Sequence, residues 1–254
     1  MDPKVYAWHG MTADAVEIID AENLSTVISL GHDWGSALAQ RLYNFYPSRV
    51  SGLVLVNVAY IPPSGHFDLD AVNKMTREIF GSGIYEYWNF FAADDAAGIM
   101  NRNPESVYSV AFGEPNTWLE NWCAPGGMRK FVSEGQVQPT LPYATPEHKA
   151  DFMDRFGKDG FESSTCWYKA FVFQVQSEAD KLVAEDAKTV KVPVLFWGGE
   201  QDFVCRPALL KSSIDAGVLP NLKSVIREGG HWALLEKPAE FGGDVLGWLE
   251  QTFR

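Results

Sequence analysis

The stretch Gly31-His32-Asp33-Trp34-Gly35 places a carboxylate at the centre of a short segment with a glycine at each end. When such a segment joins a strand to a helix, the glycines allow a sharp turn from which the central side chain projects alone. The first N–H groups of the following helix can then stabilise negative charge that develops beside it. Serine at this position attacks acyl carbon, whereas a carboxylate suits displacement at a saturated carbon that carries a leaving oxygen or halide. The alternative from the motif alone is an aspartate with a structural role or a helix-capping role.

Two distant residues could complete this chemistry. Asp202 occurs in FWGGEQDFV, after an apolar run and a glycine turn, and His231 occurs in REGGHWALLEKP, before the final helix. A carboxylate can orient the imidazole of a histidine, which then takes a proton from water. Taken singly, Asp202 could be a turn residue and His231 a surface-loop residue. The order nucleophile, acid, histidine, with each residue at a strand end, predicts a catalytic triad of Asp33, Asp202 and His231.

The elements that must position these residues indicate an α/β fold. A β-branched run, a helix ending before a proline and a nearly continuous apolar run together form one strand–helix–strand unit. The middle of the chain has dense aromatic residues and helical periodicity, and strand-like runs return only after it. The predicted elements are a helix at 3–22, a strand at 25–30, a helix at 36–46, strands at 50–58 and 192–199, a helix at 207–216, a strand at 223–226 and a helix at 238–252.

Composition excludes several classes of protein. The 254 residues carry a net charge of −12 and show no cluster of Lys or Arg, which argues against a nucleic-acid partner. No apolar run is long enough to span a membrane, and the first residues lack the layout of a signal peptide. Cys123, Cys166 and Cys205 lack metal-ligand spacing and are expected to be buried thiols. We therefore expect a cytoplasmic protein with no cofactor and no metal site.

Six segments spread over nearly the whole chain carry a family resemblance. They are GHDWGSALAQRL, YPSRVSGLVLVN, YEYWNFF, GFESSTCWYKAF, VPVLFWGGEQD and GGHWALLEKP. In these segments the chain resembles the epoxide hydrolase branch of the α/β-hydrolase family, especially its fungal members. The resemblance implies an incomplete α/β-hydrolase fold, with a mostly parallel sheet and an inserted helical cap. It places the hydrolase core at 1–60 and 186–254 and the cap at 61–185.

The resemblance also implies a reaction on a small apolar organic substrate. Asp33 would open an epoxide and form an alkyl-enzyme ester, which water activated by His231 and Asp202 would hydrolyse to a vicinal diol. Two cap tyrosines of the family protonate the leaving oxygen, and they match Tyr87 and Tyr168 here. The alternative for either tyrosine is a packed aromatic residue of the cap, and Tyr85 is the other candidate for the first position.

Four more residues are candidates for substrate or oxyanion binding. The backbone N–H of Trp34 follows the nucleophile directly and could stabilise the tetrahedral intermediate. His32 is expected to be a packed or hydrogen-bonded neighbour of the nucleophile. Trp88 and Trp167 are expected in the cap core, where they could line an apolar pocket.

Two other functions fit the same residues. The segment HDWGSAL also resembles haloalkane dehalogenases, in which the tryptophan after the nucleophile helps to hold the halide. A pair of tyrosines is redundant for that reaction, because halide leaves as a weak base. The third candidate is a truncated, non-catalytic relative that kept the pocket for binding or for a role in a pathway.

The sequence departs from the family pattern at its N-terminal end. Family members usually have four strands before the helix that leads into the nucleophile strand, and a His-Gly-x-Pro loop among them supplies a second oxyanion donor. The segment WHG at residues 8–10 is not this loop, since it lies in the predicted helix and no proline follows. The expected sheet therefore has an open edge. We expect a homodimer or another chain to cover this edge, or else the sequence is a fragment or a truncation.

Overall fold

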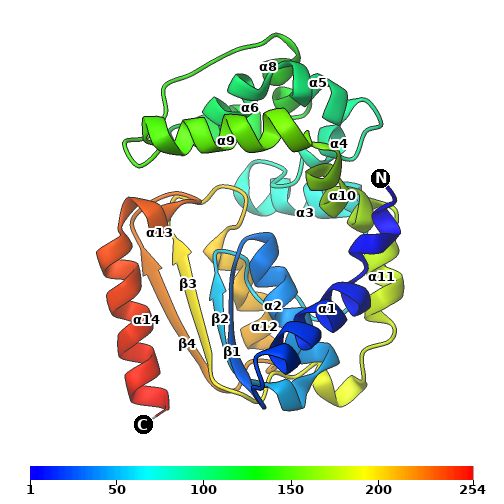
Figure 1. The fold of residues 1–254 in the computed structure, drawn as a ribbon, viewed down its shortest axis with the longest axis vertical. Coiled ribbons are helices and arrows are strands. Elements are labelled where there is room, and N and C mark those ends of the chain that lie inside the picture. Colours follow the sequence, from blue (N-terminus) through cyan, green and yellow to red (C-terminus); the bar gives the residue numbers. More distant parts are fainter. Residues whose placement is uncertain (254) are drawn as a thin grey trace. The chain divides into compact units, whose positions relative to one another are not determined.

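The computed structural model describes residues 1–253, which form two compact units (Figure 1). One unit contains Lys4–His66 and the chain from Gln174 onward, and it holds the sheet. The other contains Met1–Pro3 and Phe67–Phe173 and is helical. The sequence placed the cap at 61–185, and the assignment of these units as hydrolase core and cap stays a prediction.

The sheet unit contains four parallel strands in the spatial order β1-β2-β3-β4. Their bounds are Val27–His32 for β1, Val50–Val56 for β2, Val194–Gly199 for β3 and Leu222–Arg227 for β4. Each parallel connection returns the chain to the same end of the sheet, so the carboxyl ends of all four strands lie along one edge. The predicted α/β class with a parallel sheet is confirmed.

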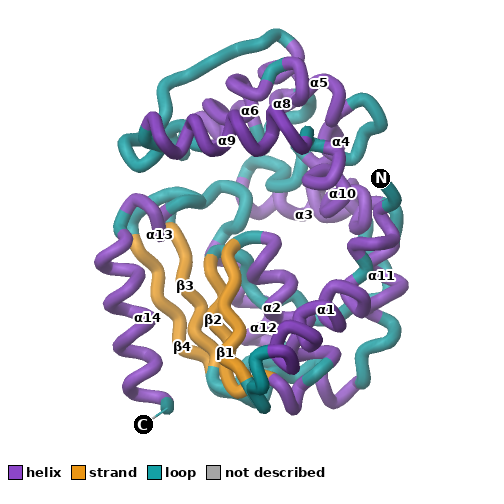
Figure 2. The backbone as a smooth tube through the Cα atoms, viewed as in Figure 1, coloured by secondary structure: helices purple, strands orange, loops and turns teal. Residues whose placement is uncertain are grey.

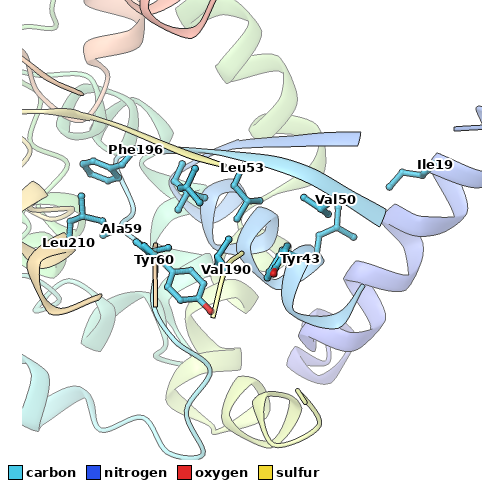
Figure 3. Close-up of a cluster of buried hydrophobic side chains, with 13 residues drawn as sticks. Ile19, Tyr43, Val50, Leu53, Ala59, Tyr60, Val190, Phe196 and Leu210 are labelled. Carbon is cyan, nitrogen blue, oxygen red and sulfur yellow. The ribbon is translucent and has the colours of Figure 1, made fainter. Parts of the chain in front are cut away.

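Helices cover both faces of this sheet, as the tube view shows (Figure 2). Leu53 and Leu55 of β2 belong to a cluster with side chains of α1 (Trp8–Ala21), α2 (Trp34–Phe45) and α12 (Leu210–Asp215). Figure 3 shows this cluster and labels most of its residues. The alternate residues Val54 and Val56 pack toward Trp248 of α14 (Pro238–Thr252). Burial on both faces explains why β2 is a continuous apolar run, and each such side chain contributes roughly 1.5–3 kcal/mol to stability.

Strand β1 lies at an edge of the described sheet. It pairs with β2 on one side, and its apolar residues Ile28 and Leu30 are 37% and 52% exposed. Exposed apolar residues on an edge strand offer a surface on which another strand or chain can pair. The dimer or partner that would cover this edge stays a prediction.

The helical unit consists of short helices held together by aromatic side chains. Asp68 caps the first of them by accepting a hydrogen bond from the N–H of Ala71, and Gly81 ends it with a left-handed backbone. The helices are α3 (Leu69–Phe80), α4 (Trp88–Phe91), α5 (Ala96–Arg102), α6 (Pro104–Ala111), α7 (Thr117–Asn121), α8 (Gly127–Ser133), α9 (Pro146–Asp159) and α10 (Glu162–Val172).

The remaining elements are short. They are the 3-10 helices at Pro3–Tyr6, Pro47–Arg49, Glu185–Ala187 and Pro207–Leu209, with α11 (Val175–Asp180) and α13 (Ala233–Glu236). The helix expected at 3–22 is interrupted because Ala7 is extended, with ψ of 135°, before α1 begins. The strand expected at 50–58 ends at Val56, because Asn57 has φ of 66° and cannot continue an extended chain. Among residues 1–253, no helix is both long and apolar enough to cross a membrane.

Candidate active site

Asp33 occupies a strained turn between β1 and α2. Its backbone has φ of 53° and ψ of −122°, a conformation that non-glycine residues rarely adopt. The N–H of Asp33 donates to the carbonyl of Val56, which fixes the turn to the next strand. A Cβ on Gly31 would lie 2.0 Å from the carbonyl oxygen of Gly35, so only glycine permits this approach. The turn therefore has the geometry of a nucleophile elbow with a carboxylate at its centre.

Asp202 and His231 meet at the ends of β3 and β4. A Cβ on Gly199 would lie 2.2 Å from the carbonyl oxygen of Gly230, so this glycine lets the loop before His231 close over the end of β3. The N–H of Gln201 donates to the carbonyl of Gly229 and holds the same loop in place. As a result, Nδ1 of His231 lies 2.8 Å from Oδ2 of Asp202.

The carboxylate of Asp202 is buried, with 1% of the residue exposed, and is satisfied by several donors. Oδ1 accepts hydrogen bonds from the backbone N–H groups of Val204 and Cys205, at 3.0 and 2.8 Å. Burial opposes ionisation, but the charge of His231 and these hydrogen bonds outweigh it and hold the pKa of Asp202 below its usual value. An ionised Asp202 only accepts hydrogen bonds, so in the neutral form of His231 the proton is on Nδ1 and the lone pair is on Nε2.

The lone pair of His231 lies close to the candidate nucleophile. Nε2 is 3.6 Å from Oδ1 of Asp33, whose side chain is 27% exposed while that of His231 is 6% exposed. Burial alone would disfavour the charged ring, yet the carboxylate of Asp202 outweighs this and raises the pKa of His231 above its usual 6.5. The candidate nucleophile and an oriented candidate base thus lie beside one another, an arrangement in which the base can accept a proton from water.

His32 packs on the other side of His231. Its Nε2–H donates to the backbone carbonyl of His231 at 3.0 Å, and the two ring centroids are 4.7 Å apart. Burial, together with the nearby charge of His231, lowers the pKa of His32 to about 4. His32 is therefore neutral at ordinary pH and holds the loop of the candidate base. Trp34, the next candidate, is half-buried at the first position of α2, directly after Asp33.

Two residues of the site escaped the sequence analysis. Asn57, at the end of β2, donates through Nδ2 to Oδ2 of Asp202 at 2.6 Å and to the carbonyl of His231 at 3.1 Å. The thiol of Cys205 lies 3.6 Å from Oδ1 of Asp33, to which it donates. The one signal for Asn57 was a polar residue that follows an apolar parallel strand. Cys205 gave no signal beyond its place three residues after Asp202.

The candidate tyrosines lie together within the helical unit. The rings of Tyr87 and Tyr168 are 5.6 Å apart and meet edge to face, whereas Tyr85 stacks on Trp88 at 4.4 Å. Trp88 is 5% exposed and also contacts the ring of Tyr168 edge-on. Trp167 is half-buried on α10, beside Tyr168 in the chain. The unit thus groups the aromatic residues that the resemblance selected, and their roles stay predictions.

Comparison with known proteins identifies the fold family. The model of the alpha/beta hydrolase fold family matches residues 3–238. The chain is 24% identical to the bifunctional epoxide hydrolase 2 of Sus scrofa over 98% of its own length, but it spans only 43% of the length of that protein. It is 22% identical to epoxide hydrolase A of Mycobacterium tuberculosis, over 97% of this chain and 76% of that one.

Solved structures agree with this match. The crystal structure of epoxide hydrolase A from Mycobacterium thermoresistibile superposes with a TM-score of 0.77 at 21% identity, over 98% of this chain and 77% of that one. An epoxide hydrolase from an endophytic Streptomyces also gives a TM-score of 0.77, at 24% identity, over 98% of this chain and 76% of that one. The chain therefore belongs to the alpha/beta hydrolase fold family, and the relatives that it resembles are epoxide hydrolases.

Proposed function

We propose that the protein hydrolyses epoxides to vicinal diols through an ester on Asp33. The observation that carries this proposal is the 3.6 Å separation between a carboxylate on a strained turn and Nε2 of His231, whose other nitrogen is held by Asp202. A carboxylate that attacked an ester would form an anhydride and gain nothing, so this nucleophile suits saturated carbon. The names of the relatives support the epoxide as the electrophile.

In the first step, an oxygen of Asp33 attacks one ring carbon of the epoxide. A carbon–oxygen bond forms to Asp33 while the ring carbon–oxygen bond breaks and its electron pair passes to the ring oxygen. An unassisted alkoxide is a poor leaving group, and a phenol that protonates it accelerates such a step by roughly 10²–10⁴-fold. Tyr87 and Tyr168 are the proposed donors, and one of them becomes a phenolate.

In the second step, His231 takes a proton from water through Nε2. The hydroxide attacks the carbonyl carbon of the Asp33 ester, and the backbone N–H of Trp34 is the proposed donor to the oxyanion. Collapse of the intermediate expels the diol and regenerates the carboxylate, and the proton on His231 returns to the phenolate through solvent. Asp202 stabilises the charged imidazole, and Asn57 holds Asp202 in place through the 2.6 Å hydrogen bond.

The tyrosine pair separates this proposal from a haloalkane dehalogenase. We expect the double variant Tyr87→Phe/Tyr168→Phe to lose roughly 10²–10⁴-fold in kcat/KM for styrene oxide, because the leaving alkoxide is no longer protonated. Tyr85→Phe is the matched control, since this neighbouring ring stacks on Trp88, and we expect it to stay within a few-fold of the original. Two results together would favour the dehalogenase. The original protein would turn over no epoxide, and the double variant would still release halide from a bromoalkane.

The raised pKa of His231 predicts the pH dependence of the second step. Water is activated only by the neutral ring, so hydrolysis of the ester should lose rate as the pH falls through the pKa of His231. Because this pKa lies above 6.5, we expect the acidic limb of kcat to have its midpoint above pH 6.5. Rapid-quench measurements at several pH values check this, with formation of the ester as the internal control. A midpoint below 6.5, or the same limb in ester formation, would contradict the assignment of His231 as the base for hydrolysis.

A further inference from the structure

We propose that Asp33, Cys205 and His231 form a three-donor site for a thiophilic divalent cation, with Zn²⁺ as its test ion. The carboxylate, the thiol and the imidazole offer ligand atoms that all lie within 4.8 Å of one another. They come from the turn after β1 and from the loops that follow β3 and β4, far apart in the chain, so the sequence shows no metal-binding spacing. Nothing in the proposed hydrolysis uses the sulfur atom of Cys205.

Two of the three separations between these atoms match the edges of a zinc tetrahedron. Bonds from zinc of about 2.0–2.2 Å to oxygen or nitrogen and about 2.3 Å to sulfur place tetrahedral ligands about 3.4 Å apart for oxygen and nitrogen and about 3.6 Å apart for oxygen and sulfur. Oδ1 of Asp33 is 3.6 Å from both Nε2 of His231 and Sγ of Cys205. Nε2 and Sγ lie within 4.8 Å of one another, so zinc would draw these two atoms closer together, and its fourth position would hold water.

Asp202 orients two of the three donors. Its Oδ2 binds Nδ1 of His231, which leaves Nε2 with a lone pair, and its Oδ1 accepts the backbone N–H of Cys205. A carboxylate on the far nitrogen of a ligating histidine is the usual outer-shell support of a zinc site, since it fixes the ring and increases its basicity. The carboxylate that prepares the base for water thus also prepares it for a metal ion.

The charges and ligand types select the class of cation. Zinc binds the thiolate, so the thiol proton passes to solvent, and the two negative ligands then balance the ion. One sulfur, one nitrogen and one oxygen suit Zn²⁺ or Cd²⁺, whereas Mg²⁺ prefers a shell of oxygen atoms alone. An occupied site would hold the nucleophile and the base at once. Binding rests on this geometry alone, while the resulting inhibition also rests on the proposed function.

Cobalt spectroscopy tests the binding directly. The metal-free full chain is titrated with Co²⁺ while the thiolate-to-cobalt charge-transfer band is recorded. Zn²⁺ is then added to displace the bound Co²⁺. We expect the original protein to bind one equivalent of Co²⁺. We expect Cys205→Ala to lose the band and to bind Zn²⁺ at least about 100-fold more weakly, since even outer-shell partners are worth 10–100-fold. Cys166→Ala removes another buried thiol, in the helical unit, and should leave the band unchanged.

Inhibition is measured in a separate experiment. The rate of epoxide hydrolysis by each protein with metal is compared with the rate of the same protein without metal. We expect Zn²⁺ to inhibit the original protein and EDTA to reverse this, Cys205→Ala to resist, and Mg²⁺ to have no effect. An original protein without a thiolate band, or a Cys205→Ala variant that binds zinc equally well, would overturn the site. If the protein hydrolyses no epoxide, the cobalt titration still decides on binding, so the two proposals fail independently.

Discussion

Asp33→Asn is expected to reduce epoxide turnover by roughly 10⁴–10⁶-fold, the loss seen when a member of a catalytic triad is removed. An amide oxygen does not attack saturated carbon under these conditions, so no ester forms. Asparagine accepts positive φ more readily than most residues, so the turn at φ of 53° should persist and the variant should fold. Steady-state assays measure the loss, and circular dichroism with thermal melting checks the fold.

Isotope labelling of the original protein shows whether Asp33 itself becomes the ester. In ¹⁸O-water under single-turnover conditions, the label should enter the carboxylate of Asp33, because water attacks its carbonyl carbon. The first diol should carry an unlabelled oxygen that comes from Asp33. Peptide mass spectrometry detects the difference. Label found directly in the first diol would exclude the ester, and full activity in Asp33→Asn would favour the non-catalytic relative.

His231→Gln is expected to stop the reaction after one step. Attack by Asp33 needs the nucleophile and the tyrosine donors, whereas hydrolysis of the ester needs the base. The variant should therefore consume one equivalent of epoxide and then turn over roughly 10⁴–10⁶-fold more slowly than the original. Intact mass spectrometry should show the protein heavier by one substrate molecule.

The double variant Asp33→Asn/His231→Gln is the control for this adduct. It should show no mass increase, because the attacking carboxylate is gone. An adduct that persists in the double variant would place the alkylation on another residue. Failure of His231→Gln to form any adduct would mean that the histidine is required for the first step, which would contradict the proposed division of labour.

The sequence predicted the sheet and the triad because each depends on a local signal. The apolar run of β2 indicated a strand buried on both faces. Asp33 lies at the centre of a glycine-flanked turn directly after a strand, and Asp202 and His231 each follow a strand and a glycine turn. Carboxyl ends of parallel strands share one edge, so strand order alone brings such residues close. The catalytic roles of these three residues stay predictions.

Asn57 and Cys205 could not be predicted in the same way. In the sequence Asn57 looks like the next residue of an apolar strand, whereas in the structure it has a positive φ and its Nδ2 donates to Asp202. The position of Cys205 depends on how the loop after β3 bends back. In this loop two backbone N–H groups donate hydrogen bonds to the carboxylate of Asp202. Such contacts follow from long-range packing of loops, which leaves no periodic pattern in the sequence.

Gly31 and Gly199 maintain the site through the side chains that they lack. Neither close approach involves the side chain at position 33, so the backbone is indifferent to the reactive group that it presents. During evolution, an exchange of carboxylate for hydroxyl there could redirect attack from saturated carbon to acyl carbon without any rearrangement of the main chain. A new reaction on this scaffold can then begin with a single substitution at position 33, while the two glycines stay unchanged.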